Sequence, residues 1–225
     1  MNKGKKRIFA NPNKIMYILI SKQMMNIQSK HILTTLLIAI ATSGCKQETK
    51  PTWTEAEKDL ITQANDTKMR LVTIENAKDS LFLRNQCVPL SKEDISTPEF
   101  AQLKKRMLLT VTDPENEGVG IAAPQVGIGR QFIAVQRIDK EGMPFEFYIN
   151  PRLAYLSEEK GTGREGCLSV PNKSGNVTRS KWVILEHNDP NTFELHHDTI
   201  RGFTAIIFQH ETDHLNGILY TDKVE

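Results

Sequence analysis

Apolar residues recur at helical spacing in a segment near the middle of the chain. Four of them follow one another at intervals of three or four positions: Phe100, Leu103, Met107 and Val111. Such spacing places side chains on one face of a helix. Thr97 and Pro98 precede this pattern, and both residue types favour the start of a helix. We therefore predict a helix over residues 98–112 with one face in the core.

A second helical pattern lies close to the end of the chain. Five side chains share its expected inner face: Phe203, Ile206, Ile207, His210 and His214. Asn216 and Gly217 follow, and a glycine after the last turn commonly ends a helix. We predict a helix over residues 200–215 that is buried on the face carrying both histidines.

Short apolar or aromatic runs between turn residues predict strands in the region that separates these two helices. We identify four runs, at residues 131–136, 145–149, 183–186 and 192–196. Turn-forming residues join the runs into two pairs. The predicted fold class is α+β, with antiparallel strands wrapped around a buried C-terminal helix.

The first 44 residues differ from the rest in charge. They contain seven Lys or Arg and no Asp or Glu, and an apolar run at residues 32–41 ends in small residues before Cys45. A run of this length is too short to span a bilayer but suits a signal peptide. The segment resembles a bacterial lipoprotein signal, which implies a lipid and a membrane tether on Cys45. A fortuitous apolar stretch is the alternative.

Three parts of the chain are predicted: a signal-like segment at 1–44, a polar tether at 45–71 and one globular domain at 72–225. Subtracting the seven basic residues of the first part from 29 leaves 22 Lys and Arg against 27 Asp and Glu. This mildly acidic balance argues against a nucleic-acid partner. The three cysteines form no close pair in sequence and do not indicate a disulfide framework.

The strongest chemical pattern is His210-Glu211-Thr212-Asp213-His214. Residues four apart lie on one face of a helix, so both imidazoles can bind one metal ion. Glu211 lies about 100° further round and could reach a water molecule beside the ion. The alternative is an exposed helix with two histidines. The apolar neighbours disfavour it, because unpaired polar groups in a core are costly.

Cys167 is the best candidate for a third ligand. A hydrolytic metal site usually has three protein ligands, and no His or Cys occurs among the eleven residues after His214. Cys167 stands in Glu165-Gly166-Cys167-Leu168-Ser169, and a metal-bound cysteine would be a thiolate. Taken alone, it would more often be a buried apolar residue.

A glycine-rich segment precedes these motifs and reads Gly118-Val119-Gly120-Ile121-Ala122-Ala123-Pro124-Gln125. Glycines let a backbone approach a ligand closely. The segment lacks the Gly-Lys-Ser/Thr ending of a phosphate-binding loop. Gln125 offers an amide donor that could stabilise a developing oxyanion.

Together and in this order, the three segments resemble the motifs of the peptide deformylases. The resemblance covers residues 72–225 and implies removal of the formyl group from N-formyl-methionyl peptides by a monomeric enzyme. It implies one divalent metal, usually Fe(II) with Zn, Ni or Co able to replace it, on Cys167, His210 and His214. Glu211 would act as the general base and acid.

Further roles follow from the same resemblance. The Gln125 side chain and the backbone N–H of Leu168 would stabilise the oxyanion. The backbone of Gly118, Val119, Gly120 and Ile121 would pair with the substrate peptide. Glu165 would pair with Arg179 and orient the loop that contains Cys167.

The sequence departs from the family near Lys173-Ser174-Gly175, where many members carry an arginine that holds the peptide. This departure leaves open a metallo-amidase or peptidase with a different substrate. A catalytically silent, membrane-tethered binding module is another alternative. The two resemblances also imply different locations, because deformylation belongs in the cytoplasm whereas a lipoprotein leaves it.

Overall fold

The structure is a computed structural model that describes residues 53–64 and 67–225. The signal-like segment 1–44, Cys45 and the first part of the predicted tether lie outside the described residues. Within the described part, no helix combines the length and apolar character needed to cross a membrane.

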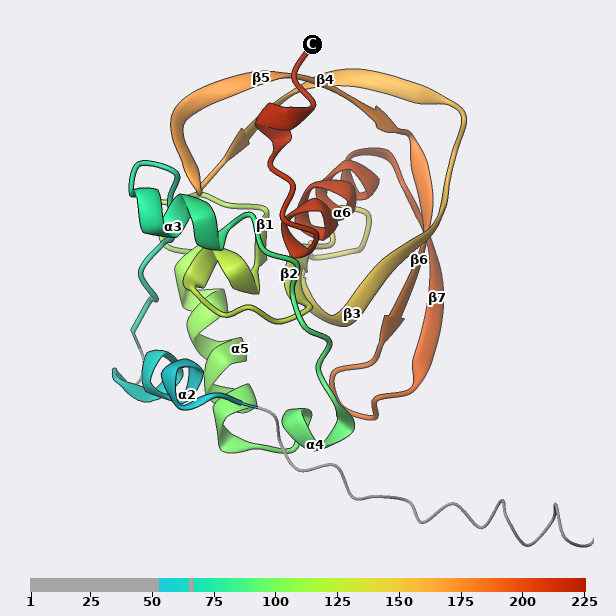
Figure 1. Cartoon of the computed structure of the whole chain (residues 1–225). Helices are drawn as coiled ribbons and strands as arrows, with labels where there is room; N and C mark the ends of the chain where they lie inside the picture. The colour runs from blue at the N-terminus through green and yellow to red at the C-terminus, as the bar shows by residue number, and fades with distance from the viewer. Residues whose placement is uncertain (1–52, 65–66) are drawn as a thin grey trace, which may run out of the picture. The chain divides into compact units, whose positions relative to one another are not determined.

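A five-stranded antiparallel sheet forms the centre of the fold (Figure 1). Its strands, in spatial order, are β1 Gly120–Ala122, β2 Phe132–Gln136, β3 Phe145–Leu156, β6 Trp182–Asn188 and β7 Leu195–Arg201. The predicted runs 131–136, 145–149 and 183–186 fall on β2, β3 and β6. The run predicted at 192–196 is only partly right, because β7 begins at Leu195 after a turn in which Phe193 has a positive φ of 64°.

A separate two-stranded sheet, which the hydrophobic pattern did not predict, contains β4 Lys160–Cys167 and β5 Val170–Ser180. Most residues of β4 are exposed, and neither strand shows a regular alternation of buried and exposed side chains. Figure 1 shows this hairpin arching over one end of the C-terminal helix. It brings Cys167 next to His214 of that helix.

The C-terminal helix α6, Gly202–Leu215, is enclosed by strands. It contacts β1, β2, β3, β5, β6 and β7. This arrangement confirms the predicted α+β class with strands wrapped around a buried helix. Phe203 is an exception to the predicted inner face, because it is 55% exposed in the first turn.

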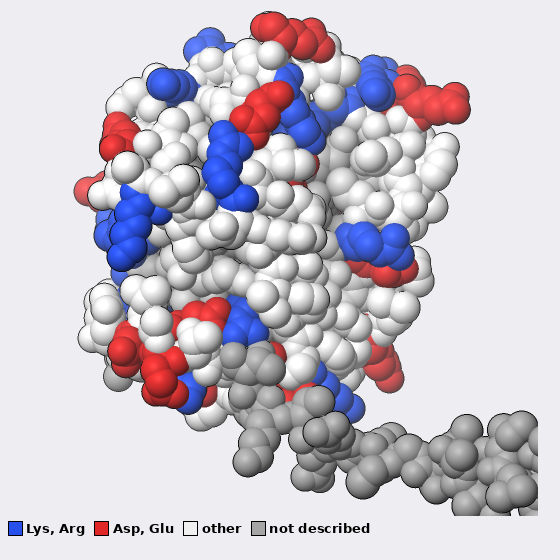
Figure 2. Space-filling view, viewed as in Figure 1, with Lys and Arg blue, Asp and Glu red and all other residues white. Residues whose placement is uncertain are grey.

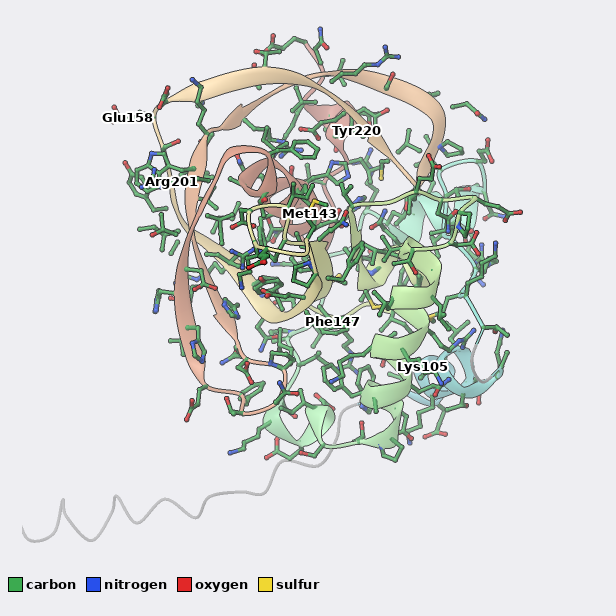
Figure 3. All side chains as sticks on the ribbon, turned by 180° about the vertical axis from the view of Figure 1, so that it is seen from behind. Lys105, Met143, Phe147, Glu158, Arg201 and Tyr220 are labelled. Carbon is green, nitrogen blue, oxygen red and sulfur yellow. The ribbon has the colours of Figure 1, made fainter. Side chains whose placement is uncertain are left out.

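The helix predicted at 98–112 is confirmed as α5, Pro98–Val111, with Thr97 as N-cap. The four apolar residues that predicted it are all buried. Phe100 packs on Phe132 of β2, which in turn stacks on Phe147, labelled in Figure 3. The shorter helices are α2 Glu55–Thr62, α3 Ala77–Phe82, α4 Lys92–Ile95, η1 Ala123–Val126 and η2 Tyr220–Asp222.

The folded domain starts earlier than the predicted boundary at residue 72. Trp53, Ile61 and Met69 are buried in the same core cluster as α5. The buried guanidinium of Arg130 donates to both oxygens of Glu57 at 2.7 Å and lies over the Trp53 ring. The prediction of a tether reaching residue 71 is therefore wrong from residue 53 onward, since these contacts join α2 to the domain.

Charges of both signs alternate on the face shown in Figure 2, with a broad uncharged area between them. Ion pairs on the surface of the domain include Arg152 with Glu186 and Lys181 with Glu159. Exposed pairs of this kind contribute little to stability.

Candidate metal centre

Helix α6 presents two histidines toward the β4–β5 hairpin, which carries Cys167. His210 and His214 lie one turn apart, and their ring centroids are separated by 5.1 Å. Both are on the buried part of the helix, with His214 only 1% exposed. Gly202, with a φ of +63°, allows the chain to turn sharply from β7 into this helix.

Cys167 meets the two histidines at the end of β4. The register of the β4–β5 pair shifts between Gly166 and Cys167, and this irregularity turns the end of the strand toward α6. The Cys167 Sγ atom lies 3.2 Å from Nε2 of His214. The ligand atoms of Cys167, His210 and His214 all lie within 4.8 Å of one another.

A buried ion-pair network orients the first histidine. Glu165 Oε2 accepts a hydrogen bond from Nδ1 of His210 at 2.9 Å. Arg179 donates to both carboxylate oxygens of Glu165, at 2.8 and 2.9 Å. Burial opposes ionisation of Glu165, but the hydrogen bonds from Arg179 and His210 lower its pKa to about 2. The carboxylate is thus ionised and fixes which ring nitrogen of His210 faces Cys167.

The same arginine reaches a second carboxylate that sequence reasoning missed. Arg179 donates to Asp213 at 2.5 Å, and Lys223 donates to both oxygens of Asp213 at 2.7 Å. Tyr220, labelled in Figure 3, stacks its ring on His210 from the same C-terminal segment. Nothing in the local pattern marks these contacts, because they join segments that meet only after folding.

These residues fit a divalent metal ion. One thiol and two imidazole nitrogens converge, and such a donor set suits borderline-soft ions such as Zn(II) and Fe(II). Cys167 also interacts with both histidines. Burial lowers the pKa of His210, yet hydrogen bonds with Cys167 and Glu165 raise it to about 10 overall. Burial also holds the pKa of His214 well below its usual value.

Glu211 lies beside this cluster but is not part of it. The side chain is buried, and burial raises its pKa to about 7. Among the described residues its Oε2 atom has no hydrogen-bond partner. A buried carboxylate with an unpaired oxygen next to three metal-binding groups can accept and release a proton.

Gln125 is held rigidly on the other side of the cysteine. Its Oε1 accepts the backbone N–H of Ala122 at 2.8 Å, which directs the amide nitrogen toward Cys167 Sγ at 3.5 Å. The short helix η1 carries it and ends at Gly127, whose φ is +83°. The amide donor therefore points to the same place as the candidate ligands and Glu211.

A groove of about 630 Å³ opens onto these groups. Gly118, Val119, Gly120 and Leu168 line it, as do the apolar side chains of Phe203, Ile206 and Ile207. Strand β1 pairs only with β2 and leaves its other edge toward the groove. The Ile121 side chain is fully buried in the core instead, so any ligand contact of this residue would involve its backbone.

Comparisons with known proteins are consistent with this geometry. The family model described as polypeptide deformylase matches residues 69–225. A peptide deformylase of Leptospira biflexa is 36% identical over 151 residues, covering 64% of this chain and 83% of that protein. One from Chloroflexus aurantiacus is 37% identical over 169 residues, covering 69% of this chain and 86% of that protein.

Solved structures agree with the sequence relatives. The class I type b peptide deformylase of Acinetobacter baumannii, bound to actinonin, has a TM-score of 0.62 and 32% identity, covering 71% of this chain and 99% of that one. The same enzyme has been solved with Met-Ala-Ser bound. The peptide deformylase of Thermotoga maritima has a TM-score of 0.60 and 29% identity, covering 70% of this chain and 98% of that one.

Proposed function

This chain belongs to the polypeptide deformylase family of metal-dependent hydrolases, and we propose that its groove removes the formyl group from N-formyl-methionyl peptides. One observation carries the proposal. Glu211, Gln125, Cys167 and His210 line one groove, and His214 lies directly behind Cys167, with its Nε2 atom 3.2 Å from Sγ. In the related enzyme of Acinetobacter baumannii, Met-Ala-Ser is bound.

Cys167, His210 and His214 would hold one divalent ion, which we propose is Fe(II), with Zn(II), Ni(II) or Co(II) able to replace it. When bound, such an ion supplies Lewis acidity that polarises a carbonyl and makes a water molecule more acidic. Glu165 and Arg179 keep His210 oriented for this role. All these groups come from one chain, so we propose that the monomer is active. Size measurement by light scattering tests this.

Glu211 would transfer a proton from the attacking water to the departing amine. Its Oε2 atom has the unpaired capacity to accept a proton from the attacking water. A pKa of about 7 lets the same carboxyl group release that proton to the departing amine. The burial that raises this pKa also excludes bulk water, which would otherwise compete for the proton.

Gln125 and the Leu168 backbone N–H would stabilise the oxyanion that develops on the formyl oxygen. The Gln125 amide costs little to reorganise, because Ala122 already fixes its orientation. The outer edge of β1 and the two residues before it would pair with the peptide backbone, through Gly118, Val119, Gly120 and Ile121. Phe203, Ile206 and Ile207 offer an apolar wall for the methionine side chain.

Formate release from formyl-Met-Ala-Ser tests the proposal. We expect turnover by the metal-loaded protein, and a loss of about 10²- to 10⁴-fold in Glu211→Gln with the metal retained. Met-Ala-Ser without the formyl group is the matched control and should not be cleaved. Full activity of Glu211→Gln would exclude the proposed proton carrier, and cleavage of the unformylated peptide would indicate a peptidase instead.

We also propose that residues 1–44 act as a signal and that Cys45 is lipidated, leaving a tether of residues 46–52. The basic start, the apolar run and the small residues before Cys45 support this proposal. Mass spectrometry of the mature N-terminus tests it. A chain that retains residues 1–44 ahead of an unmodified Cys45 would contradict it.

A further inference from the structure

The walls of the groove carry opposite charges. Besides Glu165 and Glu211 at the metal centre, three further glutamates line it, Glu75, Glu115 and Glu117. Within the described part of the chain, Arg164 is the only Lys or Arg that lines the groove. A peptide leaving the metal centre would therefore pass one cation in a groove whose other charged walls are acidic.

Arg164 is held in place by the neighbouring strand. Its Nε donates a hydrogen bond of 2.8 Å to Oγ of Ser174 on β5. Since this bond uses only Nε, the N–H groups of the two terminal guanidinium nitrogens remain available to bind a ligand. These donors have the geometry that binds a carboxylate through two parallel hydrogen bonds.

Arg164 lies at a distance that suits the residues after the methionine. It precedes Cys167 by three positions on β4, which corresponds to about 10 Å along a strand. An extended peptide rises by about 3.3 Å per residue, so the second and third residues lie about 7–10 Å from the reacting end. The side chain of Arg164 can thus contact a peptide side chain downstream of the formyl-methionine.

We propose that Arg164, positioned by Ser174, gives this enzyme a preference for formyl peptides with a carboxylate at the second or third residue. The inference rests on the proposed deformylase function and adds a determinant of its substrate choice. Arg164 is exposed, so the preference is modest, about three- to fivefold, and weakens with salt.

Two peptide series measure the preference: formyl-Met-X-Ala and formyl-Met-Ala-X, with X as Glu, Gln or Lys. All peptides are amidated at the C-terminus, because a free carboxylate there would itself bind an arginine. We expect the wild type to show a kcat/KM for Glu about three to five times that for Gln at one of the two positions. At 0.5 M salt the ratio should approach one.

Variants connect the preference to Arg164. Arg164→Gln should bring the Glu-over-Gln ratio to about one by lowering kcat/KM for the Glu peptides. Ser174→Ala should reduce the ratio, because the guanidinium is then free to turn into solvent. Arg152→Gln is the matched control, since Arg152 pairs with Glu186 and does not line the groove.

The outcomes separate the two proposals. A wild type with no Glu preference at either position, or an Arg164→Gln variant that keeps it, would overturn the role of Arg164. A ratio unchanged in Ser174→Ala would overturn the positioning by Ser174. If no formylated peptide releases formate, the proposed function itself fails.

Discussion

The carboxylate of Glu211 rests directly against the α-carbon of Gly120. A Cβ atom added at Gly120 would lie 2.5 Å from Glu211 Oε1 and 2.8 Å from Cγ2 of Ile207. The second glycine of the glycine-rich segment is therefore explained by contact with the helix that carries the proposed proton carrier. A bound phosphate is not needed to explain this glycine.

Gly120→Ala should displace Glu211. Because the new methyl group occupies the position of the carboxylate, we expect kcat to fall by about 10- to 100-fold while the metal content stays near that of the wild type. Steady-state kinetics with a formyl peptide and metal analysis on the same sample measure both. Gly163→Ala is the control, since a Cβ there meets nothing within 4 Å. A Gly120→Ala enzyme with normal kcat would show that Glu211 tolerates displacement.

Replacing Glu165 should weaken metal binding. Glu165→Gln keeps the shape of the side chain but removes the charge that Arg179 and His210 both contact. We expect metal affinity to fall by about 10- to 100-fold, measured by competition with a chelator. Glu186→Gln removes a half-buried carboxylate that does not line the groove and should leave the affinity unchanged. Equal affinities for the two variants would argue against an orienting role for Glu165.

A buried ion pair contributes to the attachment of α2 to the domain. Glu57→Gln removes the carboxylate that both Nε and a terminal nitrogen of Arg130 contact, and Arg130 is only 4% exposed, so the free energy of unfolding should fall by about 2–3 kcal/mol at pH 7. Glu55→Gln, on the same helix, breaks only an exposed pair with Lys58 and should cost less than about 0.5 kcal/mol. Denaturant titrations give both values, and a similar small loss in the two variants would contradict the prediction.

The loss in Glu57→Gln should depend on pH. Burial raises the pKa of Glu57, but hydrogen bonds from Arg130 and Thr54 outweigh it and lower the pKa below its usual value. The ionised pair therefore stabilises the fold at pH values above the unfolded pKa of Glu. That stabilisation is lost as the pH falls through the lowered folded pKa. The difference between wild type and variant should shrink over this acidic range.

The sequence predicted the elements in which one face is apolar. Helix α5 was predicted to within a residue, because the Thr97 cap, Pro98 and the apolar spacing all agree. The β4–β5 hairpin was missed because β4 contains three glycines and mostly exposed side chains, so burial leaves no periodic pattern. The start of the domain was missed because Glu57 and Arg130 are 73 positions apart.

The candidate site likewise contains some residues that the sequence predicts and others that it does not. Helical spacing alone places His210, Glu211 and His214 together, and the segment Glu165–Ser169 directs attention to Cys167. The contacts of Arg164 and Asp213 depend on which segments lie side by side after folding. A short-range sequence pattern does not encode that arrangement. Sequence reasoning therefore identifies the candidate reacting groups more readily than the residues that would position them.

Thiol labelling would test whether Cys167 is a metal ligand without measuring catalysis. Cys167 is partly exposed at the groove, whereas burial raises the pKa of the Cys87 thiol to about 12. With iodoacetamide at pH 8, Cys167 of the metal-free protein should be alkylated, and bound metal should slow this by at least about tenfold because the thiolate is then occupied. Peptide mass spectrometry assigns each site.

Cys87 is the internal control for this experiment. Its buried thiol should stay unmodified in both samples and react only after denaturant is added, because unfolding exposes it and restores its ordinary pKa. Labelling of Cys87 in the metal-free sample would mean that removal of the ion had unfolded the domain, and protection of Cys167 could then reflect folding alone. Equal labelling of Cys167 with and without metal, while Cys87 stays protected, would exclude Cys167 as a ligand and leave the two histidines without their third partner.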